Sequence, residues 1–274
     1  MKYAGYIQAT KDDFCLFEVC KRLFDEGLKD FFFSVPDEYW SGRVTPSEDV
    51  AQVDAVAKQL NDLGANARVK TFEVRKHRHP GLRLIDVETH VRNESVKWIR
   101  DSGFDHIIII DGDELWKKHY FSNLKKFVVE YKPSSIALGM IPTIGLPGYP
   151  IDGATDMATA YIGPDVWFIE CRKPSGPRPV ELVDVRGIIH FTATRRTMQE
   201  IIDKHRTSGH YDDPAYDFEG WIANTLPNAK PGLRNAHMYK PYQIWPRVRK
   251  WTKAEISEIP ESIHPYIDTQ NIDA

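Results

Sequence analysis

Apolar and polar positions change their spacing at regular intervals along the first 110 residues. Short runs that are almost wholly apolar, typical of strands buried on both faces, alternate with stretches whose apolar residues recur at helical spacing. Strands are expected at residues 3–9, 31–35, 67–74 and 106–110. Helices are expected from residue 12 or 13 to about 26, from about 46 to 63, and from about 87 to 102. This order predicts an α/β fold with a doubly wound, mostly parallel sheet.

One helix start carries a specific signal. Thr45-Pro46-Ser47-Glu48 has the form of a capping box with proline at the first helical position, and Gly64 follows the last apolar position. The sequence therefore predicts that Thr45 caps the helix that ends near Gly64.

The pattern changes after residue 116. One amphipathic helix is expected near residues 121–131, followed by strands at 135–143, 165–172 and 186–192, with loops rich in proline and glycine between them. This half is expected to be an antiparallel extension of the first sheet. The segment from residue 235 is rich in tryptophan and tyrosine, and is expected to pack on the rest of the chain.

The fourth strand holds the most informative chemistry. Residues 107–110 are four consecutive isoleucines, and they lead directly into Asp111, Gly112, Asp113 and Glu114. In open α/β sheets ligands bind at the carboxyl ends of the strands, and grouped carboxylates there suit Mg²⁺ or Mn²⁺ with a phosphorylated substrate. An Asp-x-Asp pair alone is weak evidence in a chain with 39 acidic residues, and a helix cap or a surface turn is the alternative. A cluster of carboxylates at the end of a buried strand, however, destabilises the fold unless a cation pairs with it.

Composition narrows the class of protein. The 274 residues carry a formal charge of -3 and are 42% hydrophobic, which is enough for a large core. Three cysteines make neither a disulfide framework nor a metal quartet, and no signal peptide or transmembrane run is visible, so a soluble, cytoplasmic protein is expected. Two stretches are basic. Residues 186–253 hold 12 Lys and Arg against 6 Asp and Glu, and residues 68–83 hold 6 against 1. Each is either a solvated face or a phosphate contact.

A family resemblance extends this reading. Arg92-Asn93-Glu94, the following helix, Gly103-Phe104-Asp105, the isoleucine strand and Asp111-Gly112-Asp113-Glu114 resemble the nucleotide-binding half of GT-A fold glycosyltransferases, especially family 2 and related Asp-x-Asp enzymes. The resemblance is specific over residues 86–116, looser before them and weaker after them. It implies one Rossmann-like catalytic domain over 1–234, with a nucleotide-binding half (1–116) and an acceptor-binding half (117–234). Residues 235–274 would be an aromatic, basic extension.

The resemblance also implies roles for individual residues. Asp111 would bind the nucleoside of a UDP-sugar, and Asp113, with Asp111, would hold Mn²⁺ or Mg²⁺ at the diphosphate. Arg92 and Asn93 would lie beside the nucleotide and the sugar. Other donor contacts would come from Thr10, Asp37 and Lys204, although Asp37 stands in an altered frame relative to family 2. Tyr39 or Trp40 could stack on the base or belong to the core.

A late strand supplies a further candidate metal ligand. Ile188-Ile189-His190-Phe191 is an apolar run that ends near a histidine, and the helix after it carries Lys204. A lone histidine on an apolar strand is more often a core residue, but GT-A enzymes often complete the metal shell with such a histidine. Imidazole favours Mn²⁺ over Mg²⁺. Lys204 and Arg195 are expected either to reach the diphosphate or to be ordinary solvated residues.

The general base is harder to place. An inverting transferase needs a carboxylate that takes the proton of the acceptor hydroxyl. Asp217 and Glu219, beside Trp221, are the best candidates by their distance from the Asp-x-Asp motif. The other candidates are Glu170, Asp212 and Asp213, and a retaining mechanism stays open.

The sequence thus predicts a metal-dependent hexosyl- or pentosyltransferase that moves a sugar from a nucleoside diphosphate, UDP by expectation, to an acceptor hydroxyl. The acceptor is a glycan, a lipid-linked molecule or a nucleic acid, and the basic stretches favour testing phosphate-rich acceptors such as DNA or lipopolysaccharide. The tryptophans near residues 245–251 could contact such an acceptor or pack inward. One alternative is a nucleotidyltransferase, although residues 8–12 are not the glycine-rich loop it would show. Another is a non-catalytic binder of nucleic acid or glycan.

Overall fold

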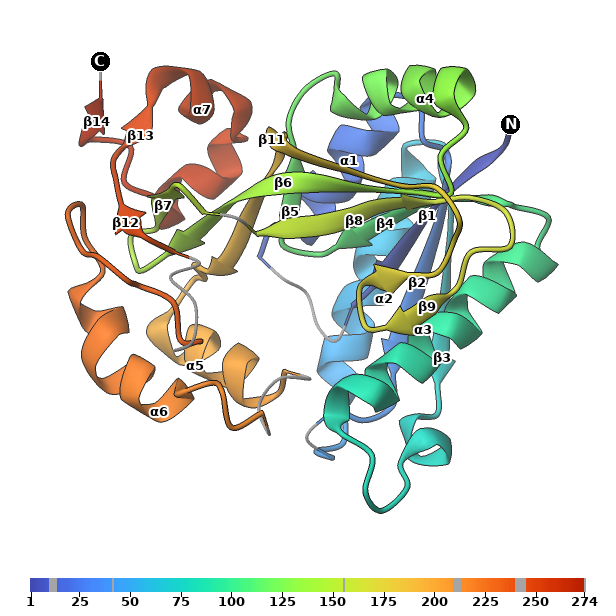
Figure 1. Ribbon diagram of the computed structural model, residues 1–274, viewed down its shortest axis with the longest axis horizontal. Coiled ribbons are helices and arrows are strands. Elements are labelled where there is room, and N and C mark those ends of the chain that lie inside the picture. The colour runs from blue at the N-terminus through green and yellow to red at the C-terminus, as the bar shows by residue number, and fades with distance from the viewer. Residues whose placement is uncertain (10–13, 41, 155, 209–212, 240–244, 274) are drawn as a thin grey trace.

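A computed structural model describes residues 1–9, 14–40, 42–154, 156–208, 213–239 and 245–273 (Figure 1). Within them, a ten-stranded mixed sheet has the order β12-β7-β6-β8-β4-β1-β2-β3, and β11 pairs with both β5 and β6. The sheet therefore joins a parallel part that begins the chain to a mixed part that follows it.

The parallel part consists of four strands. They are β1 (Tyr3–Gln8), β2 (Asp30–Pro36), β3 (Asn66–Phe72) and β4 (His106–Asp111). Strand β1 lies between β2 and β4, with Ile7 in register with Phe33 and Ile110. The crossovers contain α1 (Leu16–Asp25), α2 (Ser47–Asp62), the short 3₁₀ helix η1 (Val74–His77) and α3 (Leu84–Asp101). The expected α/β fold with a mostly parallel central sheet is confirmed.

Strand β4 is buried on both faces. Ile108 and Ile110 belong to the core formed with α1, α2 and α4, whereas Ile107 and Ile109 pack in a second core with α3. All four isoleucines have no exposed surface. The alternation of side chains along a strand thus sends two isoleucines to each helical layer, as an apolar run in a central strand predicts.

The rest of the main sheet is mixed. It contains β5 (Glu114–Trp116), β6 (Ser135–Ile144), β7 (Tyr149–Asp152), β8 (Met157–Ile162), β11 (Pro179–Ala193) and β12 (Arg247–Val248), with α4 (Tyr120–Tyr131) after β5. Strand β8 is antiparallel to both β4 and β6, but β11 is parallel to β6. Consequently β4, β6 and β11 run in the same direction, and the prediction of an antiparallel extension holds only in part.

The final elements gather at one end of the sheet, on the left of Figure 1. They are α5 (Met198–Arg206), α6 (Phe218–Gly220), a π-helical turn η2 (Trp221–Thr225), the 3₁₀ helix η3 (Leu226–Asn228), β13 (Trp251–Thr252), α7 (Lys253–Glu258), the 3₁₀ helix η4 (Glu261–Tyr266) and β14 (Ile272–Asp273). Trp245 and Trp251 are buried in two separate cores, and neither ring is exposed on the surface of the described chain. In the described part of the chain, no helix combines the length and the apolar character needed to span a bilayer.

Two local predictions are wrong. The capping box does not form, because the Thr45 hydroxyl donates to the carbonyl oxygen of Pro36 at 2.7 Å and α2 begins only at Ser47, with Pro46 as its N-cap. The expected strand at 165–172 shrinks to β9 (Phe168–Glu170), which pairs with β10 (Lys173–Pro174) in a separate two-stranded sheet. At Thr45, the contact with Pro36 outweighs the local capping signal.

Candidate functional site

A cavity of about 310 Å³ opens at the carboxyl ends of the parallel strands. Gln8 ends β1, Asp111 ends β4, and His190 lies near the end of β11, so three strands present side chains at one edge. The opposite wall comes from the C-terminal elements and includes Tyr216 and Trp245. The volume is at the lower end of the range for small-molecule sites, roughly 300–1,000 Å³.

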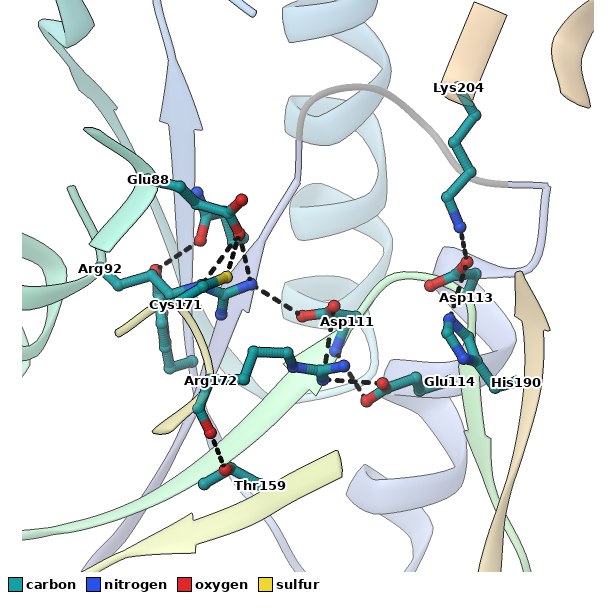
Figure 2. Close-up of polar contacts among 12 residues, drawn as sticks. Glu88, Arg92, Asp111, Asp113, Glu114, Thr159, Cys171, Arg172, His190 and Lys204 are labelled. Carbon is teal, nitrogen blue, oxygen red and sulfur yellow. Dashed lines mark hydrogen bonds and ion pairs between the residues drawn. The ribbon is translucent and has the colours of Figure 1, made fainter. Parts of the chain in front are cut away.

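Asp111 lies between two guanidinium groups, that of buried Arg92 and that of partly buried Arg172 (Figure 2). Its Oδ1 is 3.6 Å from Nη2 of Arg92, and its Oδ2 is 3.3 Å from Nη2 of Arg172. Burial raises the pKa of the Asp111 carboxyl, but Arg172 and Arg92 more than offset this, so its pKa lies below its usual value. Asp111 is therefore held as a carboxylate.

Arg172 also holds a second, deeper carboxylate. Its Nη2 lies 2.7 Å from Oε1 of Glu114, which has no exposed surface. Burial raises the pKa of Glu114 above its usual value in spite of the attraction of Arg172. Glu114 does not line the cavity, so its role is to fix Arg172 beside Asp111.

Asp113 follows β4 by two residues and is also surrounded by cationic groups. Its Oδ2 accepts from Nη2 of Arg195 at 2.9 Å and from Nζ of Lys204, and it lies 3.5 Å from Nε2 of His190. Burial raises the pKa of Asp113, but Lys204, His190 and Arg195 together bring it well below its usual value. The backbone N–H of Phe191 donates to the Asp113 carbonyl at 2.9 Å, so β11 fixes this turn.

A fourth acidic group, Glu88, lies on α3. The Nη2 and Nε atoms of Arg92 lie 3.0 and 3.1 Å from Oε1 of Glu88, one helical turn earlier. The same oxygen accepts from the thiol of Cys171 at 2.9 Å. Arg92 is thus held from behind by Glu88 and projects toward Asp111.

Several buried polar atoms that line this cavity have no hydrogen-bond partner among the described residues. They belong to the side chains Gln8 (Nε2), Arg92 (Nη1), Asp111 (Oδ1), Arg172 (Nε), His190 (Nδ1), His205 (Nε2) and Ser208 (Oγ). Buried polar groups are nearly always satisfied in folded proteins. Their concentration in one cavity indicates a site for a polar ligand that both donates and accepts hydrogen bonds.

Some of the predicted donor residues have other partners. The side-chain amide of Asn93 donates to the Phe168 carbonyl and accepts from the Phe168 N–H, both at 2.8 Å, and so anchors β9. Oδ1 of Asp37 accepts from the N–H of Val74 at 2.8 Å. Neither residue lines the cavity. Thr10 lies outside the described residues, and the predicted donor contacts of all three stay predictions.

Of the two aromatic candidates, only Trp40 lines the cavity. The Tyr39 hydroxyl donates to Asp49 instead. Trp40 is 4% exposed, and its carbonyl accepts from Arg78 at 2.6 Å. The structure therefore places Trp40, rather than Tyr39, where a ring of a ligand could contact it.

The predicted general bases do not reach the cavity. Asp217 is the N-cap of α6 and accepts from the Gly220 N–H at 3.2 Å, and exposed Glu219 pairs with Arg206 at 2.9 Å. Neither lines the cavity. Their assignment as the base stays a prediction, but the structure shows other partners for both.

The remaining base candidates are also placed elsewhere. Glu170 is exposed and lies 3.7 Å from Arg83, and Asp213 accepts from the Ala215 N–H at 2.9 Å. Asp212 lies outside the described residues. None of the described carboxylates proposed from the sequence as a base therefore lines the cavity.

The expected metal site is only partly assembled. Asp113 and His190 converge at 3.5 Å, and Nδ1 of His190 is buried without a hydrogen-bond partner in the described part of the chain. However, no group of three or more His, Cys, Asp or Glu side chains among the described residues is arranged to hold a metal ion. Lys204 and Arg195 supply positive charge at the same carboxylate. Binding of Mn²⁺ or Mg²⁺ stays a prediction.

The basic stretch 68–83 is less available than its composition indicates. Arg75 and Arg78 both pair with Glu38. The other four cations also have partners: Lys76 pairs with Glu73, Arg83 with Asp86, and Arg68 and Lys70 lie over the rings of Phe32 and Phe72. An anionic polymer on this stretch would have to compete with these partners.

Sequence reasoning missed three side chains that shape the cavity. Glu88 could have been found from its helical spacing of four residues to Arg92. Arg172 and Asp156 gave no such signal, because Arg172 lies beyond β9 and Asp156 directly precedes β8, in segments without periodicity. Only the pairing of β8 with β4 and β6 brings Asp156 to the same cavity as the Asp-x-Asp turn.

Comparisons with known proteins give a distant likeness. No family model and no curated protein sequence matches the chain. The crystal structure of S. aureus TarS 1–349 in complex with UDP-GlcNAc is 12% identical, with a TM-score of 0.45 over 83% of this chain and 72% of that one. The complex of TarS 1–349 with UDP is 13% identical, with a TM-score of 0.44 over 83% and 71%.

The overlap with TarS is also incomplete. The chain spans 66% of TarS 1–349 in another crystal structure, at 13% identity and a TM-score of 0.44 over 76% of this chain. It spans 43% of a longer TarS structure, at 13% identity and a TM-score of 0.42 over 83% of this chain. With such low identity and TM-scores below 0.5, the function of the chain has to be judged from its own geometry.

Proposed function

We propose that the chain is a glycosyltransferase that takes its sugar from a nucleoside diphosphate donor, a UDP-sugar, and transfers it to an acceptor hydroxyl. The observation that carries this proposal is the cavity at the carboxyl edge of the sheet, where paired carboxylates and cations meet buried polar atoms that have no hydrogen-bond partner among the described residues. A nucleoside diphosphate sugar has hydroxyl groups at both ends and a dianionic centre. Its binding site therefore needs carboxylates that accept from the hydroxyl groups and cations that face the diphosphate.

The carboxylate oxygens of the cavity, which accept hydrogen bonds, suit the hydroxyl groups at the two ends of the UDP-sugar. Oδ1 of Asp111 is buried with no hydrogen-bond partner among the described residues, and Arg172 and Arg92 keep the carboxyl ionised. The hydroxyl groups of the ribose and the sugar donate hydrogen bonds, and a carboxylate accepts such hydrogen bonds strongly. Trp40 offers an aromatic ring at the same cavity for the base.

The cations suit the diphosphate. Lys204, Arg92 and Arg172 line the cavity, and each is already oriented by a carboxylate. When the bond from the anomeric carbon to the diphosphate breaks, negative charge grows on the departing oxygen. Fixed positive groups in a partly dry site stabilise that charge most effectively, because they need no reorganisation during the reaction.

A divalent cation is part of the proposal. Asp113, His190 and Asp111 would hold Mn²⁺ or Mg²⁺, which when bound would add positive charge at the diphosphate. Of these, the Asp113 carboxylate and the His190 imidazole already face each other. The side chains of Lys204 and Arg195 already place positive charge beside Asp113.

The acceptor is proposed by class only: a hydroxyl of a glycan, a lipid-linked molecule or a nucleic acid. Tyr216, Phe218 and His237 line the cavity and contact one another, so they form an aromatic wall that would support a ring. DNA and lipopolysaccharide are the phosphate-rich acceptors to test. Binding through phosphates would weaken steeply with salt, whereas binding through the aromatic wall would not.

A product assay tests the function. UDP-glucose, UDP-galactose, UDP-GlcNAc and, separately, UTP are each incubated with the protein and Mn²⁺, with water, DNA or lipopolysaccharide as acceptor, and the released phosphates are identified. A glycosyltransferase releases UDP, and the release is lost in Asp113→Ala. Release of pyrophosphate from a nucleoside triphosphate would instead identify a nucleotidyltransferase, and no release from any donor would refute catalysis of either kind.

A further inference from the structure

Asp156 differs from the other carboxylates that line the cavity. Glu88, Asp111 and Asp113 each lie next to one or more Lys or Arg side chains. Asp156 has no such partner among the described residues. A carboxylate beside a Lys or Arg side chain stays ionised and can bind and orient a ligand. A carboxylate without such a countercharge keeps a higher affinity for a proton.

The position of Asp156 is fixed by two neighbours. It directly precedes β8, and its backbone carbonyl accepts from the N–H of Met140 in β6 at 2.9 Å. The indole Nε1 of Trp245 donates to its Oδ2 at 2.6 Å. Trp245 is 2% exposed, so this donor is held by the surrounding core. The second oxygen, Oδ1, has no hydrogen-bond partner in the described part of the chain.

We propose that Asp156 is the general base that takes the proton from the acceptor hydroxyl. This inference rests on the proposed glycosyl transfer. As the acceptor oxygen forms its bond to the anomeric carbon, the bond from that carbon to the diphosphate oxygen breaks and its electron pair leaves with UDP. The hydroxyl proton passes to Oδ1 of Asp156, while Trp245 holds Oδ2. Trp245 is thus a positioning residue.

The electrostatics of the cavity agree with this role. Burial raises the pKa of Asp156 above its usual value, although the hydrogen bond from Trp245 and the charge of His190 act in the opposite direction. At the same cavity, burial together with the charges of Asp213, Tyr239 and Asp156 raises the pKa of Tyr216 to about 12, so its phenol stays neutral. A base is most effective when its pKa approaches the working pH.

The test separates loss of the base from loss of the donor site. The variants are Asp156→Asn, which can still accept from Trp245, Glu219→Gln, and the control Asp184→Asn on the exposed part of β11. UDP affinity is measured by calorimetry, and the rate of UDP release by the product assay above. Asp156→Asn should slow release about 100-fold or more. Its affinity for UDP should stay within about threefold of wild type, because only the chemical step is affected.

Several results would overturn the assignment. The assignment is wrong if Asp156→Asn releases UDP at more than about a tenth of the wild-type rate. It is also wrong if Asp156→Asn no longer binds UDP, or if Glu219→Gln loses UDP release instead. If Asp156→Asn does not fold, Asp156→Ala is assayed with and without formate, and restoration of release by this small carboxylate is expected. A wild-type protein that releases UDP from no donor refutes the transferase itself, which distinguishes that failure from failure of the Asp156 assignment.

Discussion

Nη2 of Arg172 lies 2.7 Å from Oε1 of Glu114, a carboxylate that has no exposed surface. The same nitrogen lies 3.3 Å from Oδ2 of Asp111 at the wall of the cavity. One guanidinium therefore links an acid in the core to an acid in the candidate donor site. The stability of the fold and the shape of the site depend on the same residue.

Arg172→Met should destabilise the protein. It leaves Glu114 buried without its cation, and breaking a buried pair in this way costs about 3–5 kcal/mol. The free energy of unfolding is measured with urea. The double variant Arg172→Met with Glu114→Gln should recover part of the loss, because the uncompensated charge is gone. Lys97→Met, which removes an exposed pair with Asp101, is the control and should not change the midpoint. Equal effects of Arg172→Met and Lys97→Met would contradict the coupling.

Lys204→Met should weaken UDP binding by about 10- to 100-fold, the range expected for one lost hydrogen bond to a charged group. The fold should persist, because Arg195 and His190 remain beside Asp113. Calorimetric titration of UDP measures the affinity. Lys58→Met, on the exposed face of α2, is the matched control. Unchanged affinity in Lys204→Met would remove Lys204 from the diphosphate site.

The metal prediction has its own readout. Mn²⁺ should tighten UDP binding to the wild-type protein, and EDTA should reverse this. His190→Ala should bind UDP without a response to Mn²⁺, because it lacks one of the three side chains that would hold the ion. A wild-type affinity for UDP that is the same with Mn²⁺ and with EDTA would show that the chain's own cations suffice.

His205 makes stability depend on pH. Its side chain is 5% exposed and packs against Phe218 and Trp221. Burial and the neighbouring Lys204 and Arg195 bring its pKa well below 6.5. Below pH 6.5 the unfolded chain therefore binds a proton that the folded chain does not, and stability falls as pH decreases. The loss should reach about 2 kcal/mol at most by about pH 5.

The variant His205→Gln isolates the contribution of His205 to the pH dependence of stability. Urea unfolding of both proteins between about pH 7 and pH 5 should give curves that converge, with the wild type losing more stability on acidification. Parallel curves would mean that His205 takes up its proton in the folded protein.

The sequence predicted those parts of the site that follow from strand order. The four isoleucines indicated a strand buried on both faces, and Asp111 and Asp113 follow directly from where that strand ends. His190 was expected at the same edge only from the family resemblance. It reaches that edge because β11 runs parallel to β6, a direction that the expected antiparallel extension did not predict.

The sequence could not predict contacts made by segments without periodicity. Asp156 reaches the cavity through the pairing of β8, and Arg172 reaches it from the turn between β9 and β10. The sequence revealed neither arrangement. Thr45 shows the opposite error, since a clear local signal gave way to the nearby carbonyl of Pro36. Local patterns describe elements, whereas the charge balance of the cavity depends on how distant elements meet.

Binding of UDP to the wild-type protein and to Asp111→Asn is the most direct test of the central claim, that the cavity at the end of β4 holds a nucleoside diphosphate. Calorimetry should show one UDP per chain with a dissociation constant in the range of about 1 μM to 1 mM. Asp111→Asn should weaken binding about tenfold or more, because the carboxylate can no longer accept charged hydrogen bonds. No heat of binding to the wild type, with Mn²⁺ or without it, would contradict the claim.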